Sequence, residues 1–442
     1  MKEKTRPVVC WFRRDLRADD NRALSAAIGG PEKILPLFIF DDEILKDHGA
    51  FDGRLRFIAG AVMNLSKELE KKGARLACFR GRTDDIFRDI AERVNPSAVY
   101  CAKSLTWSGK SISARAAGIC RDWGVEFVEV EDNVLASVEK IGYRKVFTPF
   151  YKQWVRSLDI KPCGELSSIN AFSHDLPGIG EIIGGIEPSE KLPFDPRGAR
   201  ARLESLDLSS YGELRDRPDI DATSRLSPHI RFGTISVREI FREAAKKGGE
   251  DNQFVKELAW REFWYHIKHN FQGFRETEFQ EKRRNIRWRN DEKLFSAFRE
   301  GRTGYPLVDA GIRQLVSEKW VHGRVRMILA SFLTKDLLTD WRWGEKFFKE
   351  HLLDYDEVVN TGNWQWCASV GPDPKPLRIF NPCVQSAKFD PGCRYIKKYL
   401  PELKKVPPEN IHDPLNGRLP WHPPVIDHGE AAKKARAAYK GL

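Results

Sequence analysis

The sequence predicts an α/β domain with a doubly wound parallel sheet, followed by an all-helical domain, and three observations support this. From Pro7 to about Val130, short apolar runs alternate with amphipathic stretches of helical period. Beyond Leu206, apolar residues recur at intervals of three and four, and the strand-like runs stop. Between these regions, residues 160–205 are rich in Pro, Gly and Ser, a composition typical of a long connector. We therefore expect domains over 1–132 and 206–442, joined by a connector over 133–205.

The strands of the first domain are expected where branched, aromatic and other apolar residues run together, as in V-V-C-W-F and I-L-P-L-F-I-F. Runs of this length, separated by helical periods, are typical of βαβ units with parallel strands. The five runs cover residues 8–12, 34–40, 74–79, 97–102 and 125–130. In the second half, the stretches 254–267 and 305–316 predict amphipathic helices.

Composition indicates a soluble globular protein. Charged residues make up 31% of the 442 residues, and no apolar run reaches the roughly 18 residues of a membrane span. The N-terminus lacks the apolar segment of a secretion signal, so we expect a cytoplasmic location. The eight cysteines contain no C-x-x-C pair, which argues against a disulfide framework or a zinc site. An iron–sulfur cluster normally takes four thiolates, whereas the C-terminal half holds three. We expect no metal site and no membrane contact.

The charge balance favours a polyanionic partner. Lys and Arg number 74 against 63 Asp and Glu, which gives a net charge of +11 and a pI near 9.1. In a chain that is also rich in acids, such a surplus suggests one basic face. The alternative is a charge that merely keeps the protein in solution.

The segment Asp354–Trp366, D-Y-D-E-V-V-N-T-G-N-W-Q-W, combines two carboxylates, an amide and two indoles. Carboxylates and amides are costly to bury without partners, whereas indoles offer flat faces on which a ring can stack. The segment therefore suggests a polar, ring-shaped ligand. Alternatively, the acids begin a solvated helix and the tryptophans belong to the core.

Other segments place polar groups near helices. T-S-R-L-S (223–227) offers three hydroxyls and an arginine before a predicted helix, which suits either a phosphate site or a simple helix cap. E-L-A-W-R-E-F (257–263) puts Glu257, Trp260 and Arg261 on one helical face. In W-V-H-G-R-V-R-M-I-L-A-S-F-L (320–333), Arg324 and Met327 share one side of a helix while Arg326 points elsewhere.

Together with several further motifs, these segments resemble the DNA photolyase/cryptochrome family over essentially the whole chain, and most of all the cyclobutane pyrimidine dimer photolyases. The motifs that carry the resemblance are W-F-R-R-D-L-R-A-D-D-N (11–21), Y-R-K-V-F-T-P-F (143–150), T-S-R-L-S (223–227), E-L-A-W-R-E-F (257–263), G-R-T-G-Y-P-L-V-D-A (301–310), A-S-F-L-T-K-D-L-L (330–338) and N-W-Q-W (363–366). They occur in family order, which makes chance similarity negligible.

The resemblance implies FAD in the helical domain. The residues that would hold its diphosphate side are Tyr211, Thr223, Ser224, Arg225, Leu226 and Ser227. Asp354 and Asp356 would face the flavin ring, with Arg326 paired to Asp354 so that neither charge is buried alone. Asn360 matches the residue beside flavin N5, where a neutral amide tolerates both the protonated and the unprotonated ring. Asn at this position leans toward repair, because cryptochromes often differ there.

The resemblance also implies a chain of three tryptophans, Trp364, Trp341 and Trp288, that carries electrons between the surface and the flavin. Indoles suit this role because they are large, polarizable and oxidisable without covalent change. The alternative is three unconnected core tryptophans.

For the substrate, the resemblance implies a pocket for a pyrimidine dimer lined by Glu257, Trp260, Met327 and Trp366. The indoles would grip the dimer by stacking, and Glu257 would hydrogen-bond its carbonyls and stabilise the charge that develops. Catalytic roles fall to Glu257, Asn360 and Met327, whereas the residues expected to face DNA are Arg261, Arg324 and Gln385. Photolyases extrude the damaged bases from the duplex at a cost of about a few kcal/mol.

Two positions depart from the family pattern. Gly323 stands where many dimer photolyases have Asn, which removes a side-chain hydrogen bond to the lesion. Relatives that act on (6-4) photoproducts place His there and at Met327, and single-strand-specific relatives tend to have Gln at Met327 and Tyr at Trp366, so a dimer photolyase fits better. Residues 105–108 lack the Glu of folate-binding members, so a second, light-harvesting chromophore of flavin or deazaflavin type is expected in preference to folate.

The expected function is light-driven repair of pyrimidine dimers in DNA by a monomeric flavoprotein. The alternative is a cryptochrome, a blue-light receptor that signals without repair. A light-independent nucleic-acid-binding flavoprotein would leave the three tryptophans without a use.

Overall fold

The structure is a computed structural model that describes residues 6–47, 52–183, 195, 197–373, 377–416 and 419–440. Part of the predicted connector, residues 184–194 and 196, lies outside this set. The chain forms two compact units. The first comprises Met1–Gly142, Lys152–Leu206 and Ser224–Glu262, and the second comprises Tyr143–Tyr151, Asp207–Thr223 and Phe263–Leu442.

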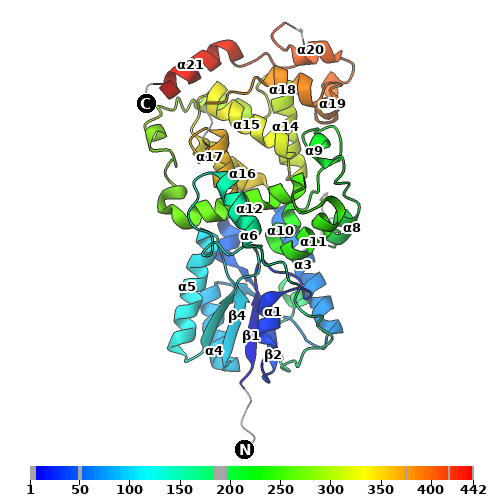
Figure 1. Cartoon of the computed structure of the whole chain (residues 1–442), viewed down its shortest axis with the longest axis vertical. Helices are drawn as coiled ribbons and strands as arrows, with labels where there is room; N and C mark the ends of the chain where they lie inside the picture. The colour runs from blue at the N-terminus through cyan, green and yellow to red at the C-terminus, as the bar shows by residue number, and fades with distance from the viewer. Residues whose placement is uncertain are drawn as a thin grey trace, which may run out of the picture. The chain divides into compact units, whose positions relative to one another are not determined.

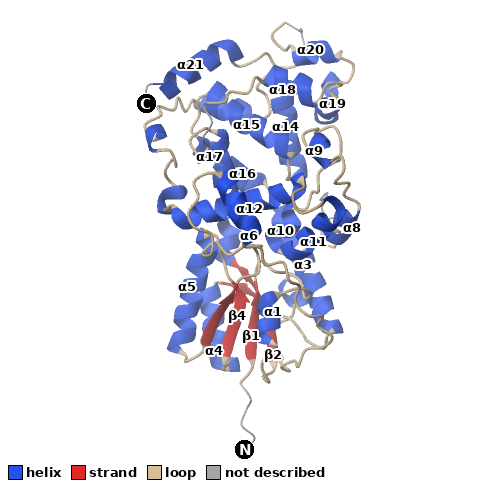
Figure 2. Ribbon diagram, viewed as in Figure 1, coloured by secondary structure: helices blue, strands red, loops and turns tan. Residues whose placement is uncertain are grey.

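The first unit is built on a five-stranded parallel sheet with the strand order β3-β2-β1-β4-β5 (Figures 1 and 2). The strands are β1 (Val8–Phe12), β2 (Ile34–Asp41), β3 (Ala77–Gly81), β4 (Ala98–Ala102) and β5 (Glu126–Val130). In register, Val8 lies opposite Ile34 on one side and Ala98 on the other. Every residue of β1 and β2 is buried, which explains why the sequence shows unbroken apolar runs there. The predicted doubly wound α/β fold is confirmed.

Strand β3 differs from its predicted range of 74–79, because it begins at Ala77 and ends at Gly81. The amide of Ala74 donates to the carbonyl oxygen of Leu69, so Ala74 still belongs to the turn that closes helix α3. Apolar character alone did not distinguish this closing turn from the first residues of a strand.

Helices connect the strands and cover the sheet (Figure 2). Those of the first unit are α1 (Arg22–Ala27), α2 (Asp42–Asp47), α3 (Asp52–Lys71), α4 (Thr83–Val94), α5 (Trp107–Asp122), α7 (Ile179–Ile182), α8 (Ala199–Glu204), α10 (Ser227–Phe232) and α11 (Val237–Gly248). Two helices contribute residues to both units, α6 (Phe147–Arg156) and α12 (Gln253–Asn270). The described connector residues before α7 are mostly irregular, and Ala171 forms an isolated bridge with Ile34.

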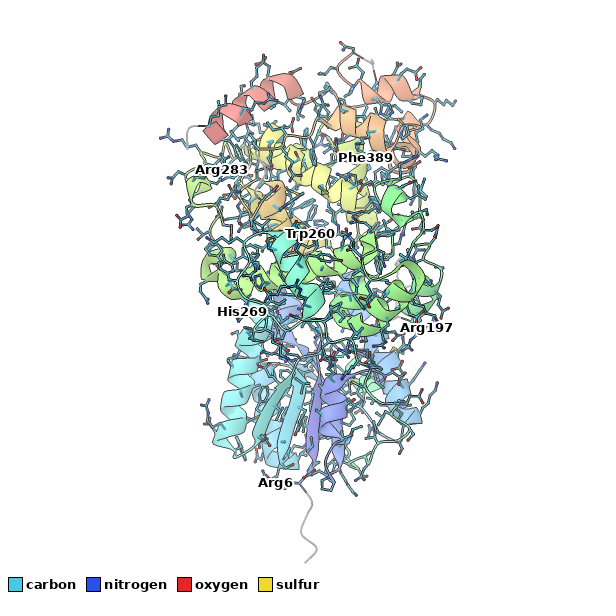
Figure 3. All side chains as sticks on the ribbon, in the orientation of Figure 1. Arg6, Arg197, Trp260, His269, Arg283 and Phe389 are labelled. Carbon is cyan, nitrogen blue, oxygen red and sulfur yellow. The ribbon has the colours of Figure 1, made fainter. Side chains whose placement is uncertain are left out.

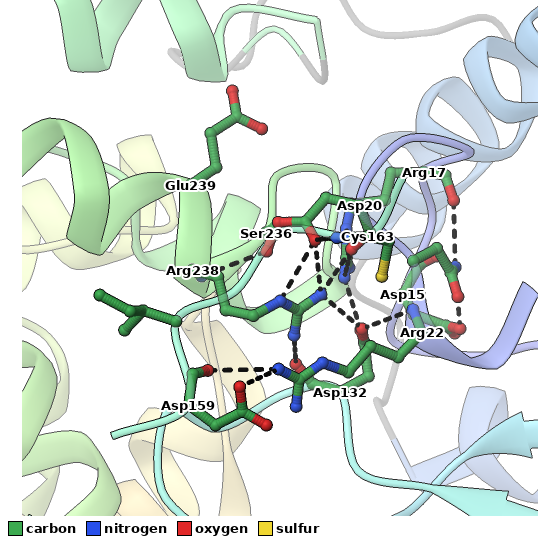
Figure 4. Close-up of polar contacts among 12 residues, drawn as sticks. Asp15, Arg17, Asp20, Arg22, Asp132, Asp159, Cys163, Ser236, Arg238 and Glu239 are labelled. Carbon is green, nitrogen blue, oxygen red and sulfur yellow. Dashed lines mark hydrogen bonds and ion pairs between the residues drawn. The ribbon is translucent and has the colours of Figure 1, made fainter. Parts of the chain in front are cut away.

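A buried ion-pair network ties distant segments of the first unit together (Figure 4). Asp132 accepts hydrogen bonds from Arg17 Nη2 at 2.6 Å and Arg238 Nη2 at 2.9 Å, and all three side chains are almost completely buried. Arg238 also pairs with Asp20 at 3.2 Å. Burial by itself would raise the pKa of Asp132, but the two guanidinium groups outweigh it and hold that pKa below the usual value. The network is a charged core in which each ion has an opposite partner.

The second unit is helical, as predicted. Its elements are α9 (Tyr211–Leu214), η1 (Gln272–Phe274), η2 (Glu281–Arg283), α13 (Glu292–Arg299), α14 (Pro306–Glu318), α15 (Gly323–Ser331), the π-helical turn η3 (Phe332–Asp336), α16 (Trp341–His351), α17 (Glu357–Cys367), α18 (Pro382–Phe389), α19 (Arg394–Tyr399), η4 (Pro401–Leu403), α20 (Pro408–His412) and α21 (His428–Lys440). A large apolar cluster of this unit includes both Trp341 and Trp364. Within the described ranges, no helix has the length and apolar character needed to cross a membrane.

Candidate functional site

The candidate site of the second unit is built around the start of α17, the helix that carries most of the Asp354–Trp366 segment. Asp356 caps this helix, because its Oδ1 accepts hydrogen bonds from the amides of Val358 and Val359 at 3.0 and 3.1 Å. Its Oδ2 accepts the hydroxyl of Tyr265 at 2.6 Å. Both oxygens of Asp356 are therefore engaged within the protein, and a direct contact of Asp356 with a flavin ring stays a prediction.

Asp354 has one oxygen bound and one free. Its Oδ2 accepts a hydrogen bond from Arg326 Nη2 at 2.8 Å, which is the ion pair expected from the sequence. Arg326 is held in turn by the carbonyl oxygen of Val321, to which its Nε donates at 2.8 Å. Asp354 Oδ1 is buried and has no hydrogen-bond partner among the described residues. A buried carboxylate oxygen without a donor is costly, so the site fits a ligand that brings an N–H or O–H group to it.

Asn360 lies one turn into α17, and its amide is fixed by a residue from another helix. Its Nδ2 donates to Oε1 of Glu345 on α16 at 3.0 Å and to the carbonyl oxygen of Glu345 at 3.2 Å. Tyr355 donates its hydroxyl to the same carboxyl oxygen at 2.9 Å. Burial raises the pKa of Glu345 above its usual value, although these two donors partly oppose the effect. Because both Nδ2 contacts go to Glu345, the carbonyl oxygen of the Asn360 amide is free to face a ligand.

The three tryptophans of the predicted electron chain lie in or against the same apolar cluster of the second unit. Trp364 and Trp341 are 2% and 1% exposed, whereas Trp288 is only partly buried. A Cβ placed on Gly344 would lie 2.1 Å from Trp364 Cη2, so the Trp364 ring rests on the backbone of α16, the helix that begins with Trp341. Trp364 therefore packs against the helix that carries Trp341.

Backbone contacts also connect the second and third tryptophans. The amide of Arg289 donates to the carbonyl oxygen of Leu338 at 2.7 Å, and Asn290 Oδ1 accepts the amide of Asp340 at 2.8 Å. The segment that follows Trp288 thus runs beside the segment that precedes Trp341. Trp364 and Trp341 are buried and Trp288 is only partly buried, and the electron chain itself stays a prediction.

The residues assigned to the diphosphate are divided between the two units. Tyr211 begins α9 and is buried, and it belongs with Thr223 to the second unit, whereas residues 224–227 belong to the first. In the first unit, Ser224 Oγ accepts the amide of Leu226 at 3.3 Å, and Arg225 adopts a left-handed conformation with φ of 50°. Ser227 begins α10, so the predicted helix is present. The role of these six residues stays a prediction.

The residues assigned to the lesion are divided in the same way. Glu257, Trp260 (labelled in Figure 3) and Arg261 lie on the part of α12 that belongs to the first unit. Glu257 Oε1 accepts a hydrogen bond from Gln253 Nε2 at 2.7 Å, and Arg261 donates to the carbonyl oxygen of Asn133 at 2.9 Å. All three residues lie in a single helix, as the predicted shared helical face requires.

The second unit contributes Met327, Trp366 and Gln385, all partly buried, and Arg324. The guanidinium of Arg378 lies 4.8 Å from the centre of the Trp366 ring. Arg324 pairs with Asp216 at 2.5 Å and stacks on Phe389, with the guanidinium carbon 4.5 Å from the ring centre (Phe389 is labelled in Figure 3). Arg324 therefore already has a carboxylate partner, with which a DNA phosphate would compete.

Three residues that the sequence analysis did not select hold candidate site residues by hydrogen bonds: Tyr265, Glu345 and Glu278. Tyr265 and Glu345 hold Asp356 and Asn360, and Glu278 accepts the indole N–H of Trp341 at 3.2 Å. They are 91, 15 and 63 positions away from their partners. No local spacing rule indicates such pairs, because helix and strand periodicities relate only near neighbours.

In the first unit, polar groups gather near the carboxyl ends of the strands, where ligands of doubly wound sheets usually bind. Arg13, just after β1, donates to Ser113 Oγ at 2.6 Å, and Ser113 donates to Glu129 on β5 at 2.8 Å. The guanidinium of Arg13 also lies 4.5 Å from the centre of the Trp11 ring. Residues 105–108 contain the cap of α5, where Thr106 Oγ1 accepts the amide of Gly109 at 3.2 Å.

Comparisons with known proteins cover the whole chain. Residues 254–441 match a family model described as the FAD binding domain of DNA photolyase, and residues 8–167 match one described as DNA photolyase. A deoxyribodipyrimidine photo-lyase from Synechococcus sp. is 33% identical over 99% of this chain and 97% of that protein.

Two solved structures are similar over nearly their full lengths. An archaeal photolyase from Sulfolobus tokodaii, solved with two FAD molecules, has a TM-score of 0.89 and 34% identity, and the match covers 99% of this chain and 100% of that chain. A cryptochrome from Synechocystis sp. has a TM-score of 0.87 and 26% identity over 99% of this chain and 100% of that chain.

Proposed function

The chain belongs to the DNA photolyase family, and on this premise we propose that it uses light to repair cyclobutane pyrimidine dimers in DNA by electron transfer from reduced FAD. The observation that carries the proposal is the 33% identity, over 99% of the chain, to a protein named deoxyribodipyrimidine photo-lyase. The enzyme would then be a carbon–carbon lyase whose substrate is damaged DNA.

The second unit suits the flavin. Asp354, with one buried oxygen free, and Arg326 would hold the polar edge of the ring. The residues that would hold the diphosphate are Tyr211, Thr223, Ser224, Arg225, Leu226 and Ser227. When bound and reduced, FAD supplies the excited electron donor whose electron opens the cyclobutane ring.

Around the ring, Asn360 and Glu345 act as a pair. Because Glu345 takes both Nδ2 contacts of Asn360, it fixes the amide with its carbonyl oxygen available to the ligand. A neutral amide in a fixed orientation accepts a hydrogen bond from a protonated ring nitrogen and tolerates the unprotonated form. Asp356 caps α17 and so helps to set the position of Asn360, and its predicted contact with the flavin ring is part of this proposal.

For the lesion, we assign stacking on the damaged bases to Trp260 and Trp366, hydrogen bonding to Glu257 and apolar contact with the damaged bases to Met327. Arg261, Arg324 and Gln385 would contact the DNA. The Gly323 position, where many family members have Asn, is exposed, and an added Cβ would meet no atom within 4 Å. We therefore expect Gly323→Asn to fold normally and to bind a dimer more tightly than the wild-type protein.

The repair assay tests the proposal directly. The purified yellow protein, with FAD chemically reduced, is incubated with a thymine-dimer oligonucleotide under blue light or in darkness. Loss of dimer only in the light supports repair, whereas equal dimer content in the two samples refutes it. DNA binding should also weaken with salt in proportion to the phosphates neutralised, and a flat response would contradict the basic-face argument.

The similarity to a Synechocystis cryptochrome favours a second candidate, a blue-light receptor without repair activity. The same assay separates the two functions. A protein that binds FAD and photoreduces it, yet leaves the dimer intact when fully reduced, would be a receptor.

For the light-harvesting chromophore, the comparison favours a flavin, because the Sulfolobus tokodaii photolyase was solved with two FAD molecules. We propose a second flavin in the first unit, in preference to deazaflavin or folate. Denaturing the purified protein and counting flavin per polypeptide tests this, since two equivalents support it and one refutes it. We further propose that the protein is a cytoplasmic monomer, and light scattering on the eluting protein tests its mass.

A further inference from the structure

The second tryptophan of the electron chain has a carboxylate at its indole nitrogen, whereas the first does not. Trp341 Nε1 donates to Oε1 of Glu278 at 3.2 Å, and both side chains are buried. Trp364 Nε1 is also buried, but it has no hydrogen-bond partner among the described residues. Two indoles in one apolar cluster thus differ in the charge that faces their N–H group.

The loop that carries Glu278 is fixed by the residue between the two site tryptophans of α17. Gln365 is fully buried, and its Oε1 accepts the amide of Phe279 at 2.9 Å. Its Nε2 donates to the carbonyl oxygens of Phe274 and Thr277 at 2.8 and 3.0 Å. Glu278 is therefore held in place rather than carried on an unrestrained loop.

A positive charge also lies against Trp341, but two carboxylates surround it. The guanidinium carbon of Arg342 lies 4.6 Å from the centre of the Trp341 ring, but the same group pairs with Glu278 at 2.9 Å and Asp340 at 3.0 Å. Arg284 Nε donates to the backbone carbonyl oxygen of Glu278 at 3.2 Å, and the side chain of Arg284 is 36% exposed. The charge closest to the indole N–H is thus the carboxylate of Glu278.

We propose that Glu278 is a positioning residue that makes Trp341 easier to oxidise than Trp364, and so directs the oxidising equivalent outward during flavin photoreduction. This inference rests on the proposed electron chain. In the step concerned, one electron passes from Trp341 to oxidised Trp364, so that Trp364 is restored and Trp341 carries the positive charge. The N–H proton stays on Trp341, hydrogen-bonded to Glu278. A negative charge in contact with the oxidised indole stabilises it in a buried, weakly screened environment.

The test compares Glu278→Gln with Glu278→Asp and with a matched control, Glu281→Gln. Gln keeps a hydrogen-bond acceptor but removes the charge, and Asp keeps the charge. Glu281 is exposed and pairs with Arg284, so its loss should change nothing. After a light flash, transient absorption should show the balance between oxidised Trp364 and oxidised Trp341 shifted about tenfold or more toward Trp364 in Glu278→Gln. For a one-electron couple, tenfold corresponds to about 59 mV.

A second measurement does not depend on photochemistry. Ultraviolet resonance Raman spectra taken in the dark should show a weaker indole N–H hydrogen bond in Glu278→Gln than in the wild-type protein, with melting temperature as the check on folding. Partial recovery of photoreduction in Glu278→Asp would support a role for charge.

The outcomes separate this inference from the function on which it rests. If Trp341→Phe blocks photoreduction while folded Glu278→Gln photoreduces at the wild-type rate, the electron chain stands and the role of Glu278 is refuted. If Trp341→Phe photoreduces normally, the chain itself is wrong and this inference falls with it.

Discussion

Replacing Gly344 with Ala should disturb both the stability of the second unit and the electron chain. Gly344 lies in α16, and an added Cβ would sit 2.1 Å from Cη2 and 2.4 Å from Cζ3 of Trp364, and 2.6 Å from Cδ2 of Leu333. Carbon atoms in contact are about 3.5–4.0 Å apart, so the Trp364 ring would have to move by about 1 Å or more. Such overpacking typically costs about 1–3 kcal/mol. Ala gains about 0.5–1 kcal/mol over Gly in a helix interior, so a net loss of about 1 kcal/mol, and at most about 2.5 kcal/mol, is expected.

The matched control is Gly323→Ala, another helical glycine, because nothing lies within 4 Å of a Cβ at that position. Thermal unfolding, followed by the fluorescence of released flavin, should show a melting temperature lowered by about 1–5 °C in Gly344→Ala and unchanged or raised in the control. Photoreduction should also slow in Gly344→Ala but not in the control, because the added Cβ displaces Trp364, the first tryptophan of the proposed electron chain. A Gly344→Ala protein that melts and photoreduces like the wild type would refute the packing argument.

Three further predictions follow from charges in the structure. Asp132→Asn should lower the free energy of unfolding, measured with denaturant, by about 3–5 kcal/mol, because it removes the carboxylate that pairs with two buried guanidinium groups. The control Asp159→Asn removes a more exposed ion pair with Arg22 and should lower it by less than about 1 kcal/mol. Equal losses in the two variants would contradict the prediction. Asp354→Asn should weaken FAD binding roughly tenfold to a hundredfold, because a hydrogen bond to a charged group is worth about 1.5–3 kcal/mol. Titration calorimetry measures this affinity. An unchanged affinity would refute the assignment of Asp354. Burial raises the pKa of Glu262 from 4.5 to about 7, so the stability that this group contributes is complete below pH 4.5 and is lost as the pH rises through 7. The free energy of unfolding, measured from pH 5 to 8, should therefore vary less with pH in Glu262→Gln than in the wild-type protein. Identical pH profiles of the two proteins would contradict the shift.

Sequence reasoning recovered the fold because strands buried on both faces must be apolar throughout, whereas amphipathic helices repeat at three and four. It placed β1 and β2 well, yet it began β3 too early, at Ala74, because the residues that close α3 have the same apolar character as a strand. The pair of Arg326 and Asp354 was expected from the resemblance, and the structure contains it.

Other parts of the site were not accessible from the sequence. The residues that hold Asp356 are one example: its oxygens accept hydrogen bonds from the start of α17 and from Tyr265, and its expected contact with the flavin ring stays a prediction. Glu345 and Glu278 carry no local signal, and each looks in the sequence like an ordinary solvated acid. Their significance arises only when another helix or loop brings Asn360 or Trp341 to them.

The sequence by itself determined the alternation of strands and helices, the basic surplus, and the set of residue types suited to a flavin, a lesion and an electron chain. The tertiary structure decided which of those residues have partners: Asp354 keeps one free oxygen, Asp356 does not, and Trp341 has a carboxylate that Trp364 lacks. The reason is physical. Periodicity is set by local backbone geometry and burial, whereas the pKa of an acid and the oxidation of an indole depend on charges and donors brought within about 3–5 Å by residues remote in sequence.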